Sequence, residues 1–344
     1  MNDSLVMLLF AALALAMTAA AVAFVTRWHH RLRSQVARVL AGNLVMGLWI
    51  AAVGLLVGEY IYRYIVDTTD AFGFSRVHRA WLARHWIVNP QGMRDNYWPY
   101  TLRPPAGKQR TVFMGDSFTA GHGIRNVEDR FCNLYRRRHP EQEVHMLAEN
   151  GWESGHQLEC LRDMARQGYV YHTLCLMYVL NDISDINPAW TRLVAVIEGA
   201  EPTGLLQHSF FLNWLLFRIK TITDPHFRHY GHEVLEAYDG PVWEEQKERL
   251  RALRRVVESG GGRLAVVLLP YFSYPAERYP YRAIHEQIGA FWRAEGVAFL
   301  DLLPLLEGRS PRELTVNPFD AHPNEKTHRL IAEQVDALLS APRN

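Results

Sequence analysis

Two long uncharged runs near the start of the chain constrain its folding most strongly. Leu5 to Val25 consists almost entirely of Leu, Ala, Val, Met and Phe, and Val39 to Val57 is weakened only by Gly and Asn. About 20 such residues are enough to cross a bilayer as a helix. We predict that residues 1–66 form a membrane anchor with two transmembrane helices, at about 5–25 and 39–62.

A cleaved signal peptide is the alternative for the first run. That run is longer than the usual apolar core, has no basic segment before it, and is followed by Arg27 rather than a small-residue cleavage site. Gly54 and Gly58 have the spacing that lets two membrane helices approach closely, which predicts a tightly packed hairpin. Simple tolerance of glycine in membrane helices explains the same pair equally well.

Charge in the connector predicts the orientation of the hairpin. The connector has no acidic residue and carries four arginines: Arg27, Arg31, Arg33 and Arg38. Under the positive-inside rule this short loop is cytoplasmic, so the large domain is extracytoplasmic, and periplasmic in a Gram-negative cell. Tyr60, Tyr62 and Tyr64 fit an interfacial aromatic belt, or equally the start of a soluble helix.

Composition excludes several classes of partner and site. The formal net charge is +1 over 344 residues, so the chain has no basic field for nucleic acid. Three cysteines are too few for a disulfide framework, although Cys132 and Cys160 can pair if the domain is exported. Cys175 lies in an apolar run and is expected to be buried. No Cys/His spacing indicates zinc, and we predict no metal and no other cofactor.

Residues 67–110 are predicted to form a lead-in and linker, which contains several prolines and a turn-like stretch from Asn89 to Asp95. Short apolar runs then alternate with amphipathic segments such as Trp243 to Glu258. The runs predict strands at Thr111 to Met114, Val144 to Ala148, Thr173 to Leu180, Arg263 to Leu269 and Val297 to Leu302. This alternation indicates a parallel sheet covered on both faces, with its site beyond the carboxyl ends of the strands.

An insertion at about 183–240 interrupts the alternation. Phe210 to Ile219 predicts an apolar helix, for which a core position is favoured over a lid or a surface resting on the membrane. His226, His229 and His232 do not hold one face of a helix well, so a solvated polar loop is favoured over a metal site.

The first predicted strand ends in Gly115-Asp116-Ser117, a tight turn that lifts Ser117 out of the sheet. A serine there, with a helix starting behind it, exposes its hydroxyl and aims its backbone N–H where an anion can sit. An ordinary serine in a strand-to-helix turn is the plain alternative. The other strand ends decide between the two.

Three later strand ends carry the other groups that acyl transfer requires. Asn150 to Gly155 follows the second strand and brings glycine N–H groups close to a bound oxygen, and Asn181 follows the third strand with a side-chain amide donor. Asp320 and His322 lie just before the closing helix and supply a base with a carboxylate to orient it. Each has a plain structural explanation, but together they favour a Ser-Asp-His triad.

These four blocks resemble those of the SGNH, or GDSL, family of serine hydrolases and acyltransferases, over roughly Thr111 to Leu339. Asn150, Ser154 and Gly155 match the family's Asn-x-x-x-Ser-Gly block, so Gly155 is preferred to Gly151 as an oxyanion donor. The resemblance implies a flavodoxin-like three-layer α/β/α parallel sheet, the SGNH hydrolase fold, over residues 111–344.

The resemblance also implies the roles of the site residues. Ser117 is the nucleophile, His322 the base and Asp320 the carboxylate that orients it. The N–H groups of Ser117 and Gly155 and the side chain of Asn181 form the oxyanion hole.

The chain departs from the family pattern at two positions. Val179 stands where the third block usually has Gly, and a single residue, Ala321, separates the acid from the histidine of the fourth block. His328 is the competing histidine, for which a structural role is favoured.

We therefore expect a membrane-anchored esterase that acts on an ester-linked acyl group of an envelope glycan or lipid through an acyl-Ser117 intermediate. The alternative is an O-acyltransferase, such as an O-acetyltransferase, that modifies an exported polysaccharide beside a membrane acyl-donor protein. A non-catalytic glycan-binding module is the third possibility.

Overall fold

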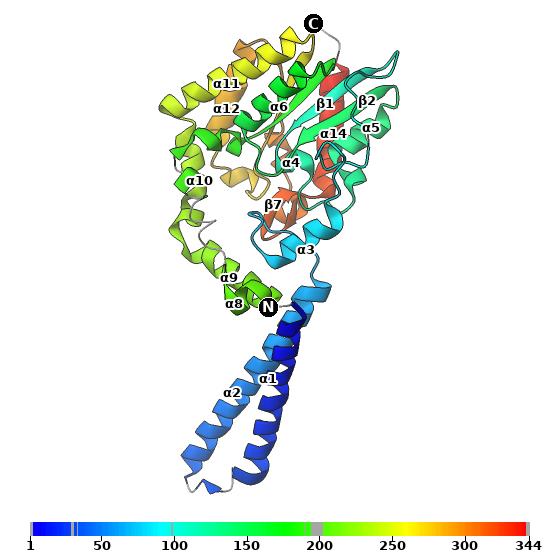
Figure 1. Cartoon of the computed structure of the whole chain (residues 1–344). Helices are drawn as coiled ribbons and strands as arrows, with labels where there is room; N and C mark the ends of the chain where they lie inside the picture. Colours follow the sequence, from blue (N-terminus) through cyan, green and yellow to red (C-terminus); the bar gives the residue numbers. More distant parts are fainter. Residues whose placement is uncertain are drawn as a thin grey trace. The chain divides into compact units, whose positions relative to one another are not determined.

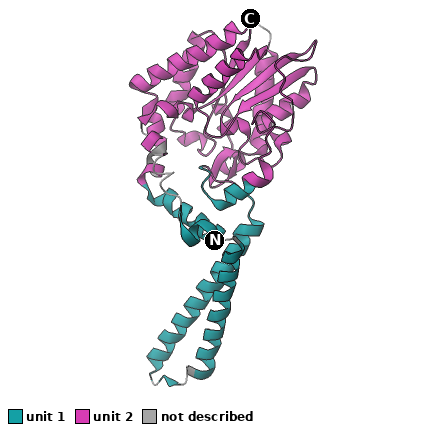
Figure 2. Ribbon diagram, viewed as in Figure 1, with its two compact units in different colours: residues 1–68, 72–81, 197–224 teal, residues 69–71, 82–196, 225–344 magenta. Residues whose placement is uncertain are grey.

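The computed structural model describes residues 3–28, 31–32, 34–97, 99–188, 190–192, 194 and 202–341. The chain divides into two compact units, coloured separately in Figure 2. Residues 1–68, 72–81 and 197–224 form one, called here the anchor unit. Residues 69–71, 82–196 and 225–344 form the other, the sheet unit.

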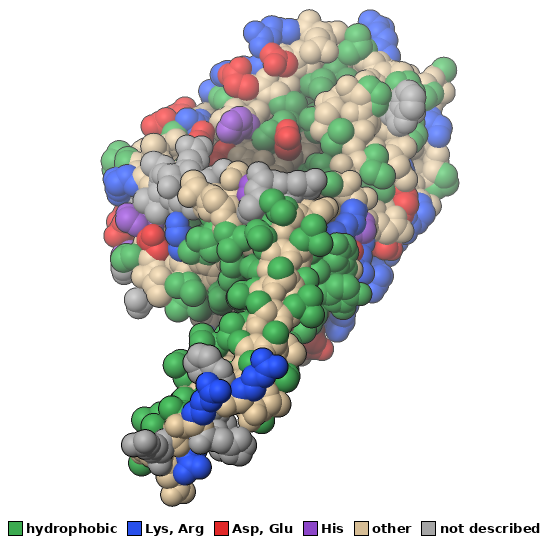
Figure 3. Space-filling model, turned by 60° about the horizontal axis from the view of Figure 1, so that its bottom comes forward, with side chains coloured by type: hydrophobic (Ala, Val, Ile, Leu, Met, Phe, Trp, Pro, Cys, Tyr) green, Lys and Arg blue, Asp and Glu red, His purple; other side chains and the backbone are tan. Residues whose placement is uncertain are grey.

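The anchor unit contains the predicted hairpin. Helix α1 (Asp3–Ala23) continues as the π-helix η1 (Phe24–Trp28), and α2 (Gln35–Tyr60) continues as η3 (Ile61–Ile65). Both helices are long and apolar enough to cross a membrane by length and composition. Hydrophobic side chains cover the hairpin, and Lys and Arg side chains gather at its tip (Figure 3).

Gly54 and Gly58 do not lie in the contact between the two helices of the hairpin. A Cβ atom added at Gly54 would meet nothing within 4 Å, and one at Gly58 would meet the ring of Phe211 rather than α1. The close-approach hypothesis is therefore wrong for the contact between the two helices. Their described contacts include a hydrogen bond of 2.9 Å from Trp49 Nε1 to Thr18 Oγ1.

Two helices of the insertion, α8 (Gly204–His208) and α9 (Phe210–Thr223), also belong to the anchor unit. The predicted helix at Phe210 to Ile219 is confirmed by α9. The favoured core position is wrong, because α9 buries Phe210, Asn213 and Phe217 but exposes Leu215 and Ile219.

The sheet unit contains the five predicted strands, all parallel, in the order β2-β1-β3-β4-β5. They are β1 (Gln109–Gly115), β2 (Gln142–Ala148), β3 (Thr173–Val179), β4 (Arg263–Leu269) and β5 (Ala298–Asp301). This is the flavodoxin-like order. Because helices cover both faces, the central strands are buried along almost their whole length, which is why they are apolar runs without alternation.

Helices pack in two groups around the sheet (Figure 1). Helix α5 (Phe131–Arg138) packs with α14 (Glu325–Ser340), and α6 (Ser154–Arg166) packs with α11 (Gly240–Ser259). Helix α12 (Arg282–Ala294) covers β5. The predicted three-layer α/β/α sheet is therefore confirmed.

The remaining described elements are short, apart from α10. They are α3 (Arg76–His85), α4 (Ser117–Ala120), η4 (Val127–Asp129), η5 (Leu180–Ile186), α10 (Pro225–Ala237), η6 (Ala276–Arg278), η7 (Leu303–Leu306), α13 (Pro311–Leu314), and the antiparallel pair β6 (Thr315–Asn317) and β7 (Asp320–Pro323).

The polar loop predicted around the three histidines is wrong, because they lie in α10. His232 Nδ1 lies 3.3 Å from Glu236 Oε1, one helical turn later on the exposed surface of α10. Cys132, Cys160 and Cys175 are all free thiols, and Cys175 is buried as expected.

Candidate active site

Ser117 is the first residue of α4, immediately after β1. Asp116 caps this helix, its side chain accepting a hydrogen bond of 2.9 Å from the N–H of Phe118. The first N–H groups of a helix have no partner within it, so the Ser117 N–H lies where a bound oxygen can use it. The turn predicted from Gly115-Asp116-Ser117 thus starts a helix at the serine.

Ser117, His322 and Asp320 form a continuous hydrogen-bonded chain. His322 Nε2 lies 2.8 Å from Ser117 Oγ, and His322 Nδ1 lies 2.5 Å from Asp320 Oδ1. Asp320 and His322 are both on β7, where residues two apart point to the same side. The single intervening residue, Ala321, is therefore the spacing that a strand needs to bring both side chains together.

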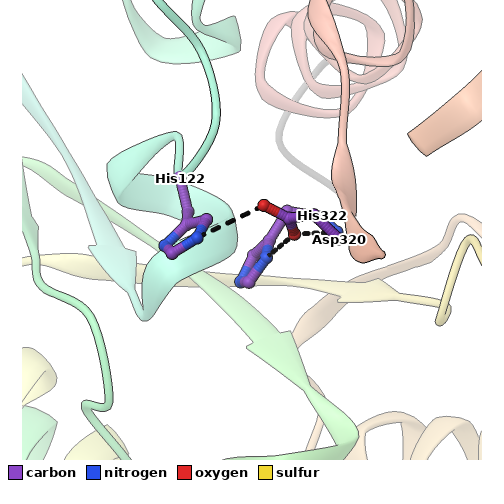
Figure 4. A group of neighbouring side chains, drawn as sticks. All are labelled: His122, Asp320 and His322. Atoms are coloured by element: carbon purple, nitrogen blue, oxygen red, sulfur yellow. Dashed lines mark hydrogen bonds and ion pairs between the residues drawn. The ribbon is translucent and has the colours of Figure 1, made fainter. Parts of the chain in front are cut away.

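A second histidine, His122, extends the hydrogen-bonded series of Ser117, His322 and Asp320 (Figure 4). His122 Nε2 lies 3.3 Å from Asp320 Oδ2 and 3.2 Å from the carbonyl oxygen of Asp70. Its ring stacks on that of His322, with centroids 4.1 Å apart. The hydroxyl of Thr69 also donates a hydrogen bond to Asp320 Oδ2. Asp320 is thus held by contacts on both carboxylate oxygens.

Sequence reasoning gave neither His122 nor Thr69 a role. His122 ends the Gly-Asp-Ser stretch, five residues after Ser117, and that proximity was the available signal. Thr69 precedes β1 by 40 residues and has no motif around it, so its contact becomes visible only in three dimensions.

Electrostatics favour a neutral His322 and an ionised Asp320. Burial lowers the pKa of His322, and the charge of His122 lowers it further against the attraction of Asp320. Burial alone would raise the pKa of Asp320, but the two histidines and their hydrogen bonds hold it well below its usual range. Burial opposes protonation of His122, yet Asp320 and Asp70 raise its pKa above the ordinary value.

The predicted oxyanion donors Gly155 and Asn181 lie in the helices that follow β2 and β3, the two strands next to β1. Gly155 is in the first turn of α6, and Asn181 is in η5 directly after β3. β1 pairs with both β2 and β3, so the three strand ends are adjacent. Asn181 Nδ2 lies 3.4 Å from Asp116 Oδ2, which places its amide beside the residue that precedes Ser117.

The position of Gly155 leaves no room for a side chain. A Cβ atom there would collide with the carboxylate of Asp185, which is ion-paired with Arg249 of α11. Val179, which replaces the family's usual Gly, is fully buried in β3. Its N–H donates to Asp182 Oδ2 at 3.4 Å, so the strand end is fixed by a side chain two residues past Leu180.

Two buried carboxyl groups, those of Asp116 and Asp182, are next in sequence to Ser117 and Asn181. Burial raises the pKa of Asp116 to about 7, and the charge of Glu153 raises it against the hydrogen bonds from Phe118 and Asn181. Burial and the nearby Asp116 raise the pKa of Asp182 well above its usual value. These two buried acids therefore hold a proton to higher pH than exposed carboxyl groups do.

The lead-in contributes a buried arginine. Arg94 donates to the backbone carbonyls of Ala120, Gly121 and Ile124, which follow Ser117. Asn89, whose side chain accepts from the N–H groups of Gln91 and Met93, forms the turn that precedes it. The turn-like stretch in the sequence thus supports the loop after Ser117.

His328 is positioned as a structural histidine. It is fully buried, its Nδ1 accepts a hydrogen bond of 3.2 Å from the N–H of Phe131, and its ring stacks on the Phe131 ring. Burial and the charges of Arg130 and Arg94 lower its pKa to about 3. It stays neutral at physiological pH.

Among the described residues, His122, Asp320 and His322 form the one cluster with metal-ligating atoms close together, all within 4.8 Å of one another. Both nitrogens of His322, Nε2 of His122 and both oxygens of Asp320 already have partners in Ser117 and in one another. Hydrogen bonds account for this geometry without a metal ion.

No protein-family model matches the chain, and no curated protein matches it. Solved structures similar to it include TesA, with 13% identity, a TM-score of 0.43 and coverage of 67% of this chain and 98% of that one. A member of the lipolytic G-D-S-L family from Veillonella parvula gives 13% identity, a TM-score of 0.44 and coverage of 68% and 100%.

Esterase EstA from Pseudoalteromonas sp. gives 14% identity, a TM-score of 0.41 and coverage of 67% and 97%. At such identities and TM-scores these likenesses assign no activity to the chain.

Proposed function

We propose that this protein is a serine hydrolase of the SGNH type that cleaves a carboxylic ester through an acyl-Ser117 intermediate. The observation that carries the proposal is the continuous chain from Ser117 Oγ through His322 to Asp320, with distances of 2.8 and 2.5 Å. In this arrangement a weak nucleophile is activated by a base that a third group orients.

Each proton in the proposed cycle has a place in this chain. Ser117 Oγ attacks the ester carbonyl while its proton passes to His322 Nε2. The bond between the acyl carbon and the alcohol oxygen then breaks, and His322 returns the proton to the departing alcohol. In the second half, His322 takes a proton from water, whose oxygen attacks the acyl carbon. The bond between the acyl carbon and Ser117 Oγ then breaks, His322 returns the proton to Oγ, and the acid is released.

The developing oxyanion requires preorganised donors. The proposal gives this role to the N–H groups of Ser117 and Gly155, both in the first turn of a helix, and to the Asn181 amide. One such donor is typically worth about 3–4 kcal/mol of transition-state stabilisation.

A fluorophosphonate probe tests the proposal on the purified full chain. We expect labelling of the wild type, none of Ser117→Ala, and strongly slowed labelling of His322→Ala. Hydrolysis of p-nitrophenyl acetate should follow the same order. Labelling that persists in Ser117→Ala would reject the assignment.

The acyl-serine can be attacked by water or by another hydroxyl group. Transfer of the acyl group to a glycan is therefore the second candidate function. Its specific support is the pair of helices long enough to cross a membrane, which suits an enzyme of the cell envelope. In this setting the sheet unit is extracytoplasmic and a membrane protein supplies the acyl group. Incubation with an acetyl donor and a polysaccharide acceptor distinguishes the two, because a hydrolase releases free acetate whereas a transferase acetylates the glycan.

A further inference from the structure

Helix α9 is attached to α2 by a carboxylate that α2 itself supplies. Glu59 is fully buried, and its oxygens accept hydrogen bonds of 3.1 Å from the N–H groups of both Phe210 and Phe211. The hydroxyl of Ser209 donates to the same carboxylate at 2.6 Å. A negative charge here satisfies the free N–H groups of the first turn and opposes the positive end of the helix dipole.

Arg63 completes the attachment. Its guanidinium donates to Glu59 Oε1 at 2.6 and 3.0 Å and to the carbonyl oxygen of His208 at 3.3 Å. It also lies over the ring of Phe210, 4.8 Å from the centroid. An ion pair removed from water is stable only when further contacts satisfy both partners, and here α9 and the residues before it provide those contacts.

The two helices are packed closely at this point. A Cβ atom at Gly58 would lie 2.8 Å from the ring of Phe211, so the approach requires glycine. The ring of Tyr62 lies 5.5 Å from that of Phe211 and 4.6 Å from that of Trp214. The position of α9 on the end of α2 is thus fixed by both packing and charge.

The number of uncharged residues before Glu59 indicates how deep in a bilayer its contact with α9 would lie. The uncharged run from Val39 to Gly58 holds about 20 residues, which is what the hydrocarbon core of a bilayer requires. The helical segment continues to Ile65. Glu59 and the tyrosines after it therefore come where hydrocarbon gives way to headgroups, the depth that tyrosine prefers.

The face of α9 that turns away from its buried side is apolar as well. Leu215, Ile219 and Ile222 are 38%, 50% and 64% exposed and share one face by their spacing of four and three. The opposite face carries the buried residues Phe210, Asn213 and Phe217. A helix with apolar residues on both faces requires a second apolar neighbour.

We infer that α9 is an interfacial helix whose Leu215, Ile219 and Ile222 enter the boundary between acyl chains and headgroups of the leaflet reached by the end of α2. This inference rests on the proposed membrane anchoring. Lipid is the occupant because the helix that carries this exposed face is joined at its start, through Glu59 and Gly58, to the helix proposed to span the bilayer. Burial of three such side chains follows the usual behaviour of interfacial helices.

Fluorescent labelling of the full chain in lipid vesicles tests the inference. In a Cys160→Ser background the two remaining cysteines are buried, so a single added cysteine takes the fluorophore. Ile219→Cys reports on α9, Met46→Cys on the middle of α2, and Glu258→Cys, on an exposed residue of α11, serves as the aqueous control. Quenching is measured with lipids carrying a nitroxide either near the headgroup, for position 219, or deep in the acyl chain, for position 46, and with aqueous iodide.

The label at position 219 should be quenched by nitroxide lipids about threefold or more above the control and be shielded from iodide. Iodide access without lipid quenching at 219, or shielding from both quenchers because protein covers the face, would overturn the inference. A label at position 46 that lipids do not quench would overturn it by removing the membrane anchor. Ester hydrolysis, measured on the same samples with a soluble substrate, reports on the proposed function independently of all three results.

Discussion

His122 Nε2 lies 3.3 Å from Asp320 Oδ2, the carboxylate oxygen opposite the one that His322 Nδ1 contacts. One carboxylate is therefore shared by two stacked histidines, and only His322 reaches the serine. A positive charge on His122 stabilises ionised Asp320 and disfavours a second positive charge on His322. His122 thus acts on the base through both the shared carboxylate and the stacked ring.

His122→Phe should move the acid limb of the pH–rate profile to higher pH. The substitution keeps a ring against His322 but removes the charge that lowers the His322 pKa, so that pKa rises, by an amount on the order of one unit. Activity is lost as pH falls through this pKa, because protonated His322 cannot act as a base. The kcat/KM profile for a soluble ester measures the shift, and an unchanged acid limb would contradict it.

Thr69→Val should lower kcat by about tenfold with little change in KM. The hydroxyl donates to Asp320 Oδ2, and its loss loosens the carboxylate that orients His322 without touching substrate. Thr69→Ser retains the donor and is the matched control. If the serine and valine variants are equally impaired, the effect lies in packing and the hydrogen bond has no part in it.

Asn181→Ala should lower kcat by about 100-fold or more, as expected for a donor used mainly in the transition state. Its amide lies beside Asp116 at the strand end adjacent to the nucleophile. Steady-state kinetics on a short-chain ester separate the effects, since a raised KM with normal kcat would mean that Asn181 binds substrate uniformly. Fluorophosphonate labelling of the variant should be slowed as well.

Asp116→Asn should stabilise the folded protein relative to the wild type, and this gain should be larger at pH 8 than at pH 5. The folded state raises the Asp116 pKa to about 7, above the unfolded value of 3.8. Between these values the folded chain binds the proton and the unfolded chain does not, so wild-type stability falls as pH rises through this range. The amide retains an acceptor for the Phe118 N–H and has no charge to bury. Thermal unfolding in detergent at the two pH values measures the difference, and equal shifts at both would contradict the prediction.

Chelation should leave activity unchanged. His122, Asp320 and His322 are close enough to ligate an ion, yet their contacts with Ser117 and one another require protons at the same atoms. Dialysis against EDTA followed by an ester-hydrolysis assay, with and without added Zn²⁺, measures this. Activity lost on dialysis and restored by the metal would assign the cluster to metal binding.

The sequence alone predicted the five strands, because each central strand is buried on both faces and so appears as an uninterrupted apolar run bounded by polar residues. It also led to Ser117 and Asn181, since polar residues that closely follow buried strands stand out against that pattern. Gly155, Asp320 and His322 were identified with the help of the family resemblance. The common edge of Ser117, Gly155 and Asn181 follows from the parallel order of β2, β1 and β3. The proposed roles of these residues rest on that order together with the family resemblance.

Only the tertiary structure revealed the contacts of Thr69, His122 and Arg94 with the site, and the attachment of α9 to Glu59. These contacts join residues from separate segments of the chain, and no local periodicity records which distant side chain a polar atom meets. Patterns of burial and turn formation depend on neighbours in sequence, so they can be read from it. The partners of a buried carboxylate depend on how segments far apart in the chain pack, and these were decided by the folded structure.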